Sequence, residues 1–171
     1  MKTLFNILYA IFILFILSVG VHLFEYLSVI ARSAHDLVFV DQLKIDSNLD
    51  ITIAFLNSVL AIYILIHFLK FIKVLKRISE KVLFSKENGK AFFKIGRALV
   101  YYSLLKFVVG FINFISTSVL HEDLHPYKIG VALGEQIRFR IPLLGIAMFL
   151  LIIAKLMKDG YELKNENDLT I

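Results

Sequence analysis

Hydrophobic residues fall into four long runs, and almost every charged residue lies between or beyond these runs. The runs cover residues 4–31, 51–69, 99–120 and 141–157. A bilayer core of about 30 Å needs roughly 20 mostly apolar residues in a helix, and only the fourth run falls slightly short of that length. Helices satisfy their own backbone hydrogen bonds inside hydrocarbon. The pattern therefore predicts an all-α, four-helix transmembrane bundle, with residues 1–171 forming a single membrane domain.

Composition supports membrane spans rather than buried core helices. The 171 residues are 58% hydrophobic, against roughly 45–50% in an average soluble domain. The excess is grouped into long blocks, as in membrane spans. The chain has no cysteine, which excludes disulfides, thiolate catalysis and cysteine-ligated metal clusters.

The distribution of charge predicts an orientation. The central loop, 70–98, carries nine Lys and Arg residues against two acids, whereas residues 32–50 carry two basic residues against four acids. Because Lys and Arg are enriched on the cytoplasmic side, we expect the loop, both termini and the tail at 158–171 to be cytoplasmic. We therefore expect a multi-pass membrane protein.

The central loop itself predicts local structure. Basic and apolar residues alternate at helical spacing after Lys70, which indicates that the second span continues as an amphipathic helix. Ser85 is a candidate N-cap for the next helix, and Asn88-Gly89 could alternatively form a tight turn. The positive charge suits anionic lipid or an acidic partner. No nucleic-acid recognition motif accompanies it, so we expect no direct nucleic-acid binding.

Four polar residues interrupt the spans. Lys106 is predicted about two turns from the cytoplasmic face, where it either serves a function or extends its amine to the inner headgroups. His67 is expected at similar depth, as a potential neighbour of Lys106. Asn57 and Asn113 are expected to make hydrogen bonds between helices.

Further polar and small residues suggest other roles in the membrane. His22 and Glu25 lie one turn apart and are predicted near the outer surface. Glu25 and Lys106 are then expected toward opposite faces of the membrane, without a direct ion pair. Mid-span glycines indicate close helix packing; they are Gly20, Gly110 and Gly145.

Residues 121–125 match the zinc-peptidase pattern H-E-x-x-H. That pattern needs both histidines on one helix and a third ligand, and Pro126 follows immediately. Only Glu135 is a nearby acidic candidate for the third position. We therefore expect no enzyme, metal or cofactor, and keep a membrane peptidase as a remote alternative.

The C-terminal tail carries the clearest family signal. It ends Leu163-Lys164-Asn165-Glu166-Asn167-Asp168-Leu169-Thr170-Ile171, an acidic cluster closed by apolar residues. This ending resembles the bacterial family called domain of unknown function 2975, as does the segment from Leu83 to Lys90 with the later Gly96. Length, span number and loop placement are also similar.

The resemblance implies a four-span membrane protein without established activity, often encoded beside a small helix-turn-helix regulator of the Cro/C1 type. We therefore predict a regulatory or interaction protein that binds such a regulator at its cytoplasmic face. The expected contact residues come from the loop and the tail; they are Ser85, Asn88, Lys90, Lys94, Leu163, Glu166, Asp168, Leu169, Thr170 and Ile171. The alternative is a small, oligomeric transporter or channel subunit with Lys106 and Asn113 near its pathway.

Overall fold

Four long helices account for the chain in the computed structural model, which describes residues 2–39, 45–80, 85–120 and 125–169. They are α1 (Lys2–Phe39), α2 (Ile45–Glu80), α3 (Lys86–Leu120) and α4 (Pro126–Leu169). Each contains a segment long and apolar enough to cross a membrane. The prediction of an all-helical protein with four membrane-compatible helices is confirmed.

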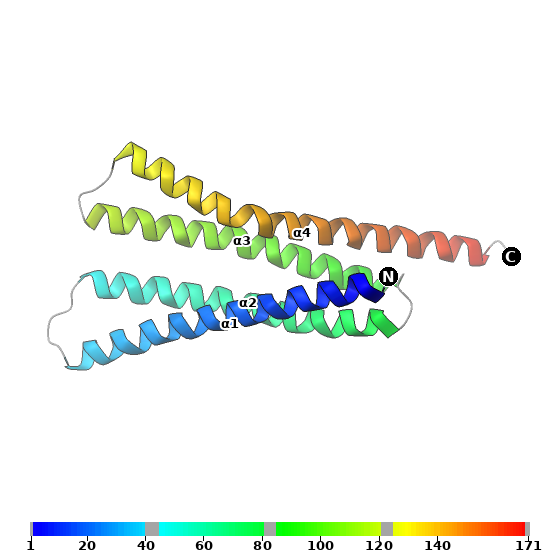
Figure 1. Cartoon of the computed structure of the whole chain (residues 1–171), viewed down its shortest axis with the longest axis horizontal. Coiled ribbons are helices and arrows are strands. Elements are labelled where there is room, and N and C mark those ends of the chain that lie inside the picture. The colour runs from blue at the N-terminus through cyan, green and yellow to red at the C-terminus, as the bar shows by residue number, and fades with distance from the viewer. Residues whose placement is uncertain (1, 40–44, 81–84, 121–124, 170–171) are drawn as a thin grey trace.

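The helices run antiparallel, and each packs on its neighbour in sequence (Figure 1). Within the described residues, α1 packs on α2, α2 on α3 and α3 on α4, and α1 makes no backbone approach to α4. The N-terminus, the C-terminus and the α2–α3 connection lie at one end of the molecule, which we call the termini end (Figure 1). The other end, where α1 connects to α2 and α3 to α4, is the hairpin end.

The main core lies in the half of the molecule nearer the termini end. Phe12, Phe68 and Phe71 meet there, with ring centroids 5.2 Å and 4.9 Å from Phe12. Phe92 continues the cluster from α3, with its ring 4.8 Å from that of Phe71. These aromatic contacts join α1, α2 and α3 into one packed unit.

Small residues on α3 allow α4 to approach closely. Gly89, Gly96, Ser103 and Gly110 recur every seventh position, so they lie along one face of the helix. A Cβ added at Gly96 would lie 2.9 Å from Leu151 and 3.1 Å from the carbonyl oxygen of Ala147. Such a stripe suits helix packing in membranes, where small residues let backbones come together.

The glycine prediction is therefore partly wrong. Gly110 is closely packed, since an added Cβ would lie 2.6 Å from the Gln136 side chain. Gly20 and Gly145 have no atom within 4 Å of such a Cβ, so they face open space. Gly96 is also closely packed, and Gly89 contacts the backbone of α4; the seven-residue spacing of these two glycines is visible in the sequence.

The predicted start of α3 is confirmed. The hydroxyl oxygen of Ser85 accepts a hydrogen bond from the Asn88 backbone N–H at 3.2 Å, as expected of an N-cap. Asn88 and Gly89 lie inside α3, so the alternative of a tight turn is wrong.

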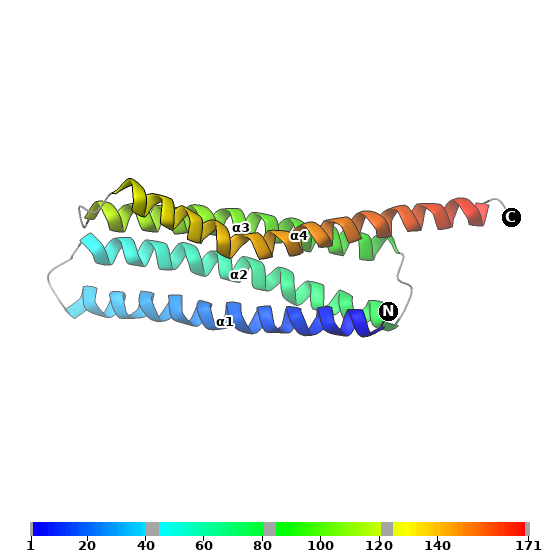
Figure 2. The same cartoon turned by 45° about the horizontal axis from the view of Figure 1, so that its top comes forward.

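The fourth helix is longer than the apolar run that predicted it. It begins at Pro126, a favoured residue for the first helical position, so the interpretation of residues 126–140 as loop is wrong. Pro142 lies within the helix without ending it. At the other end, α4 continues through the predicted tail to Leu169 and projects beyond the other helices (Figure 2).

Candidate functional site

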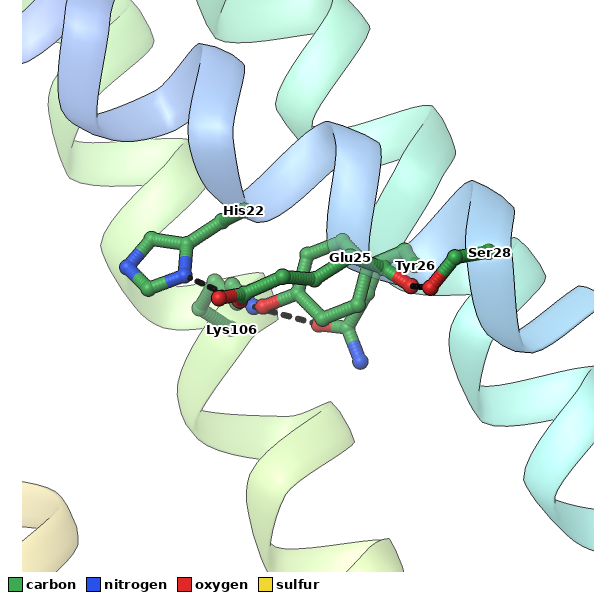
Figure 3. Close-up of polar contacts among 6 residues, drawn as sticks. His22, Glu25, Tyr26, Ser28 and Lys106 are labelled. Atoms are coloured by element: carbon green, nitrogen blue, oxygen red, sulfur yellow. Dashed lines mark hydrogen bonds and ion pairs between the residues drawn. The ribbon is translucent and has the colours of Figure 1, made fainter.

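A polar cluster lies near the middle of the helices, where an apolar interior would be expected. Lys106 Nζ on α3 donates a hydrogen bond to the hydroxyl of Tyr26 on α1 at 2.8 Å and another to Asn57 Oδ1 on α2 (Figure 3). The same ammonium lies 4.7 Å from the centre of the Tyr26 ring, a cation–π distance. We call Tyr26, Asn57 and Lys106 the central polar cluster.

The three residues meet because their helices place them at one level. Each lies 12 to 14 residues from the hairpin end of its own helix, about 20 Å along the axis at 1.5 Å per residue. Each is also at least 20 residues from the termini end, about 30 Å away. Lys106 is thus near the middle of α3, and its amine is held by neighbouring helices.

Asn57 is the buried member of the central polar cluster. It is 8% exposed, and its Nδ2 donates to the Ile53 carbonyl at 2.9 Å while its oxygen accepts from Lys106. The amide therefore links the backbone of α2 to a cation on α3. Both acceptors of Lys106 described by the structure are neutral groups, so no carboxylate there offsets its charge.

A second cation, Arg140 on α4, lies near this cluster. It is 14 residues from the start of α4, as Lys106 is 14 residues from the end of α3, so the two cations lie at a similar level. Arg140 Nη2 donates to Gln136 Oε1 at 3.4 Å, whereas its buried Nε has no hydrogen-bond partner among the described residues. This position of Arg140 was not predicted, because the polar residues around it in the sequence indicated a loop.

An acid near this level, Glu25, pairs with a histidine. Glu25 Oε2 lies 2.9 Å from His22 Nδ1, and their side chains are 59% and 57% exposed (Figure 3). Glu25 precedes Tyr26 in α1, so it lies at a similar level to Lys106 and the expectation that the two lie toward opposite faces is wrong. Among the described residues Glu25 nevertheless forms no ion pair with Lys106.

The other predicted intramembrane residues lie apart from Lys106. His67 is ten residues from Asn57 along α2, about 15 Å nearer the termini end. Its Nδ1 lies 2.9 Å from the carbonyl oxygen of Tyr63, so its contact is within α2 and the expected pairing with Lys106 is wrong. Asn113 is exposed, and its side chain has no hydrogen bond within the described part of the chain.

The predicted contact residues near the α2–α3 connection lie at the termini end. Ser85 caps α3, whereas the side chains of Lys90 and Lys94 are exposed on its first turns. These two lysines line a groove between α3 and α4 with a volume of about 940 Å³, and a second groove between α2 and α3 of about 560 Å³.

The predicted tail residues belong to α4 as far as the structure describes them. Leu163 is 62% exposed and Glu166 is exposed on the projecting part of the helix. Asp168 and Leu169 are its last two residues, and Thr170 and Ile171 lie outside the described residues. Residues 163–169 are thus helical, which excludes an extended strand over this segment.

Little of the zinc-peptidase pattern can be placed. Residues 121–124 lie outside the described part, and His125 directly precedes α4 in a non-helical position. Among the described residues no group of three or more His, Asp or Glu side chains could hold a metal ion.

Comparison with known families identifies the chain as a whole. The family described as Protein of unknown function (DUF2975) matches residues 1–171. The chain belongs to the DUF2975 family. This confirms the resemblance seen in the sequence, over the full length of the chain. No curated protein and no solved structure matches it.

Proposed function

We propose that this DUF2975 member is a non-enzymatic regulatory protein of the bacterial cytoplasmic membrane. Its termini end faces the cytoplasm and binds a small helix-turn-helix transcription regulator. The excess of Lys and Arg in residues 70–98 supports the orientation. The resemblance noted in the sequence supports the class of partner.

The projecting part of α4 is the observation that carries the proposal. This segment projects beyond the other helices (Figure 2). Residues 162–167 within it are all exposed. Leu163 is an apolar side chain there with most of its surface uncovered, flanked by Glu162 and Glu166. A helix that presents an apolar anchor between charged residues suits docking into a groove of a partner protein.

Charge favours a DNA-binding partner. Proteins that bind DNA place Lys and Arg against phosphates, so their binding surfaces are basic. The tail is acidic at Asp159, Glu162, Glu166 and Asp168. Docking of this helix on the basic surface would hold the regulator at the membrane and compete with DNA.

The remaining predicted contact residues take different roles in this proposal. Lys90 and Lys94 are exposed cations on α3, beside the part of α4 from which the projecting segment continues. Ser85 and Asn88 act by fixing the start of α3, since the Ser85 hydroxyl is engaged with the Asn88 N–H. Leu169, Thr170 and Ile171 extend the apolar end of the tail.

Co-purification with the regulator encoded beside the gene tests the proposal. We expect Leu163→Ala, and separately deletion of residues 169–171, to lower the amount of co-purified regulator at least fivefold. Leu156→Ala is the matched control, because Leu156 is 60% exposed on the same helix but lies within its apolar run. Retention of the regulator by both tail variants would refute the tail's role.

A small transporter or channel subunit is the second candidate, and the central polar cluster favours it. An ionisable residue at mid-membrane depth is costly and is commonly functional. Lys106→Leu should then abolish ion flux into liposomes that contain the purified protein. Flux that survives this substitution unchanged would argue against a pathway at Lys106.

A further inference from the structure

The groove between α3 and α4 at the termini end is lined by an unusual number of cations. Five lysines contribute to it from both helices: Lys86, Lys90, Lys94, Lys155 and Lys158. The acids in its lining are Asp159 and Glu162, so cations exceed acids by three. Glu162 pairs with Lys158 at 3.6 Å along α4, and among the described residues the other four lysines form no ion pair with a carboxylate.

Apolar side chains line the groove together with the lysines. They are Phe93, Leu151 and Ala154, and Phe93 is 49% exposed. Gly89 adds no side chain, and a Cβ there would lie 3.4 Å from the Ala154 carbonyl oxygen. The groove therefore combines cationic with apolar lining, and a phospholipid likewise combines an anionic headgroup with apolar acyl chains.

The position of the groove along the helices agrees with that polarity. On α4 the apolar run ends just before Lys158, with Lys155 in its last turn, and on α3 the run begins just after Arg97. Phe93 and Lys94 lie about one turn from this boundary, as do Lys155 and Lys158. Lysines at this depth lie at the level of lipid headgroups, and basic pockets between transmembrane helices bind such headgroups.

From these observations we propose that the α3–α4 groove binds the phosphate headgroup of an anionic phospholipid. Its lysines contact the phosphate, and one acyl chain continues toward the membrane over Phe93 and Leu151. The site shares Lys90 and Lys94 with the surface proposed for the regulator, but its ligand is a lipid and its binding requires no other protein.

Competition between two lipids tests this site. The purified full-length protein in mild detergent is given equal amounts of phosphatidylglycerol and phosphatidylcholine with the same acyl chains, and bound lipids are counted by native mass spectrometry. We expect preference for phosphatidylglycerol. Lys94→Gln combined with Lys155→Gln should lower the bound ratio of the two lipids about tenfold or more, since each lysine near a lipid surface favours anionic lipid.

Lys73→Gln combined with Lys76→Gln is the matched control. Both residues are exposed on α2 near the same end and lie outside both grooves. Substituting them removes the same number of positive charges as the double variant in the groove. The control should leave the lipid ratio within about twofold of the wild-type value. An equal loss in both double variants would contradict a defined site, because diffuse attraction would then explain the preference.

Two soluble competitors separate the lipid from other anions. Glycerol phosphate and polyglutamate, each added at the lipid concentration, should leave phosphatidylglycerol bound. Displacement by glycerol phosphate would show a site for free phosphate esters. Displacement by polyglutamate would show a surface for acidic peptides, and either result would overturn the proposal.

Discussion

Lys106 illustrates how one cation is accommodated between helices. Its ammonium has the hydroxyl and the ring face of Tyr26 on α1 and the amide oxygen of Asn57 on α2 as neighbours. An ammonium buried without acceptors costs far more than one that is hydrogen-bonded. The central polar cluster therefore couples the packing of α1, α2 and α3 to the state of one side chain.

That coupling predicts unequal effects of two asparagine substitutions. Asn57→Leu should lower the free energy of unfolding by about 1–3 kcal/mol, because it leaves the Lys106 ammonium short of an acceptor. Asn113→Leu removes an exposed amide on α3 whose side chain has no hydrogen bond among the described residues. This substitution should change the free energy of unfolding by less than about 0.5 kcal/mol. Denaturant unfolding in detergent micelles measures both.

The double variant Asn57→Leu with Lys106→Leu completes a thermodynamic cycle. We expect it to be more stable than the sum of the two single changes, because removing both polar groups leaves neither unsatisfied. Strict additivity would show that the Lys106–Asn57 hydrogen bond contributes nothing to the folded state.

The sequence showed that the members of the central polar cluster are polar, but it did not predict that they contact one another. Lys106 and Asn57 stand out in apolar runs, yet their contact depends on which helices are neighbours and at what register. Arg140 was missed for a different reason. Glu135, Gln136 and Arg138 precede it, so a hydropathy pattern assigns the segment to a loop although it is helical.

At the scale of elements, the approach of α3 to α4 depends on the glycine stripe. Its seven-residue spacing could have been found in the sequence, since Gly89, Gly96 and Gly110 share one helical face. The sequence could not show which helix covers that face. The tail was also only partly predictable. Its polarity indicated solvent exposure, but not that the helix continues into it from the apolar part of α4.

The stripe predicts that glycines on α3 and α4 differ in tolerance of a methyl group. Gly96→Ala should destabilise the protein by about 1–3 kcal/mol, because the methyl meets the Ala147 backbone as well as Leu151. Gly145→Ala should be neutral or stabilising by up to about 1 kcal/mol, since that site is open and Ala favours helix. Thermal unfolding of the two variants under one set of conditions compares them, and equal stability would argue against close α3–α4 packing.

The start of α3 offers a second test at this scale. Ser85→Ala should lower the free energy of unfolding by about 1 kcal/mol by removing the cap on the Asn88 N–H. Ser85→Asp should retain most of the stability, because aspartate is also a good N-cap. A loss of equal size in both variants would show that the hydroxyl acts in some way other than capping.

At the scale of the whole molecule, two regions with different chemistry lie at different levels along the four helices. The middle holds the central polar cluster among apolar surfaces, and the termini end holds the lysine-lined groove and the projecting helix. If the termini end faces the cytoplasm, the projecting helix and the lysine-lined groove lie on the same side of the membrane as the regulator and the anionic lipid leaflet. Orientation is therefore the claim on which the proposed function depends.

Cysteine labelling in intact cells tests that claim most directly, because the natural chain has no cysteine of its own. Lys164→Cys places a thiol on the exposed projecting helix, and Tyr127→Cys places one at the hairpin end, where Tyr127 is 80% exposed. A membrane-impermeant maleimide should label Tyr127→Cys in intact cells and Lys164→Cys only after the membrane is opened. Labelling of Lys164→Cys in intact cells, with Tyr127→Cys protected, would contradict the account.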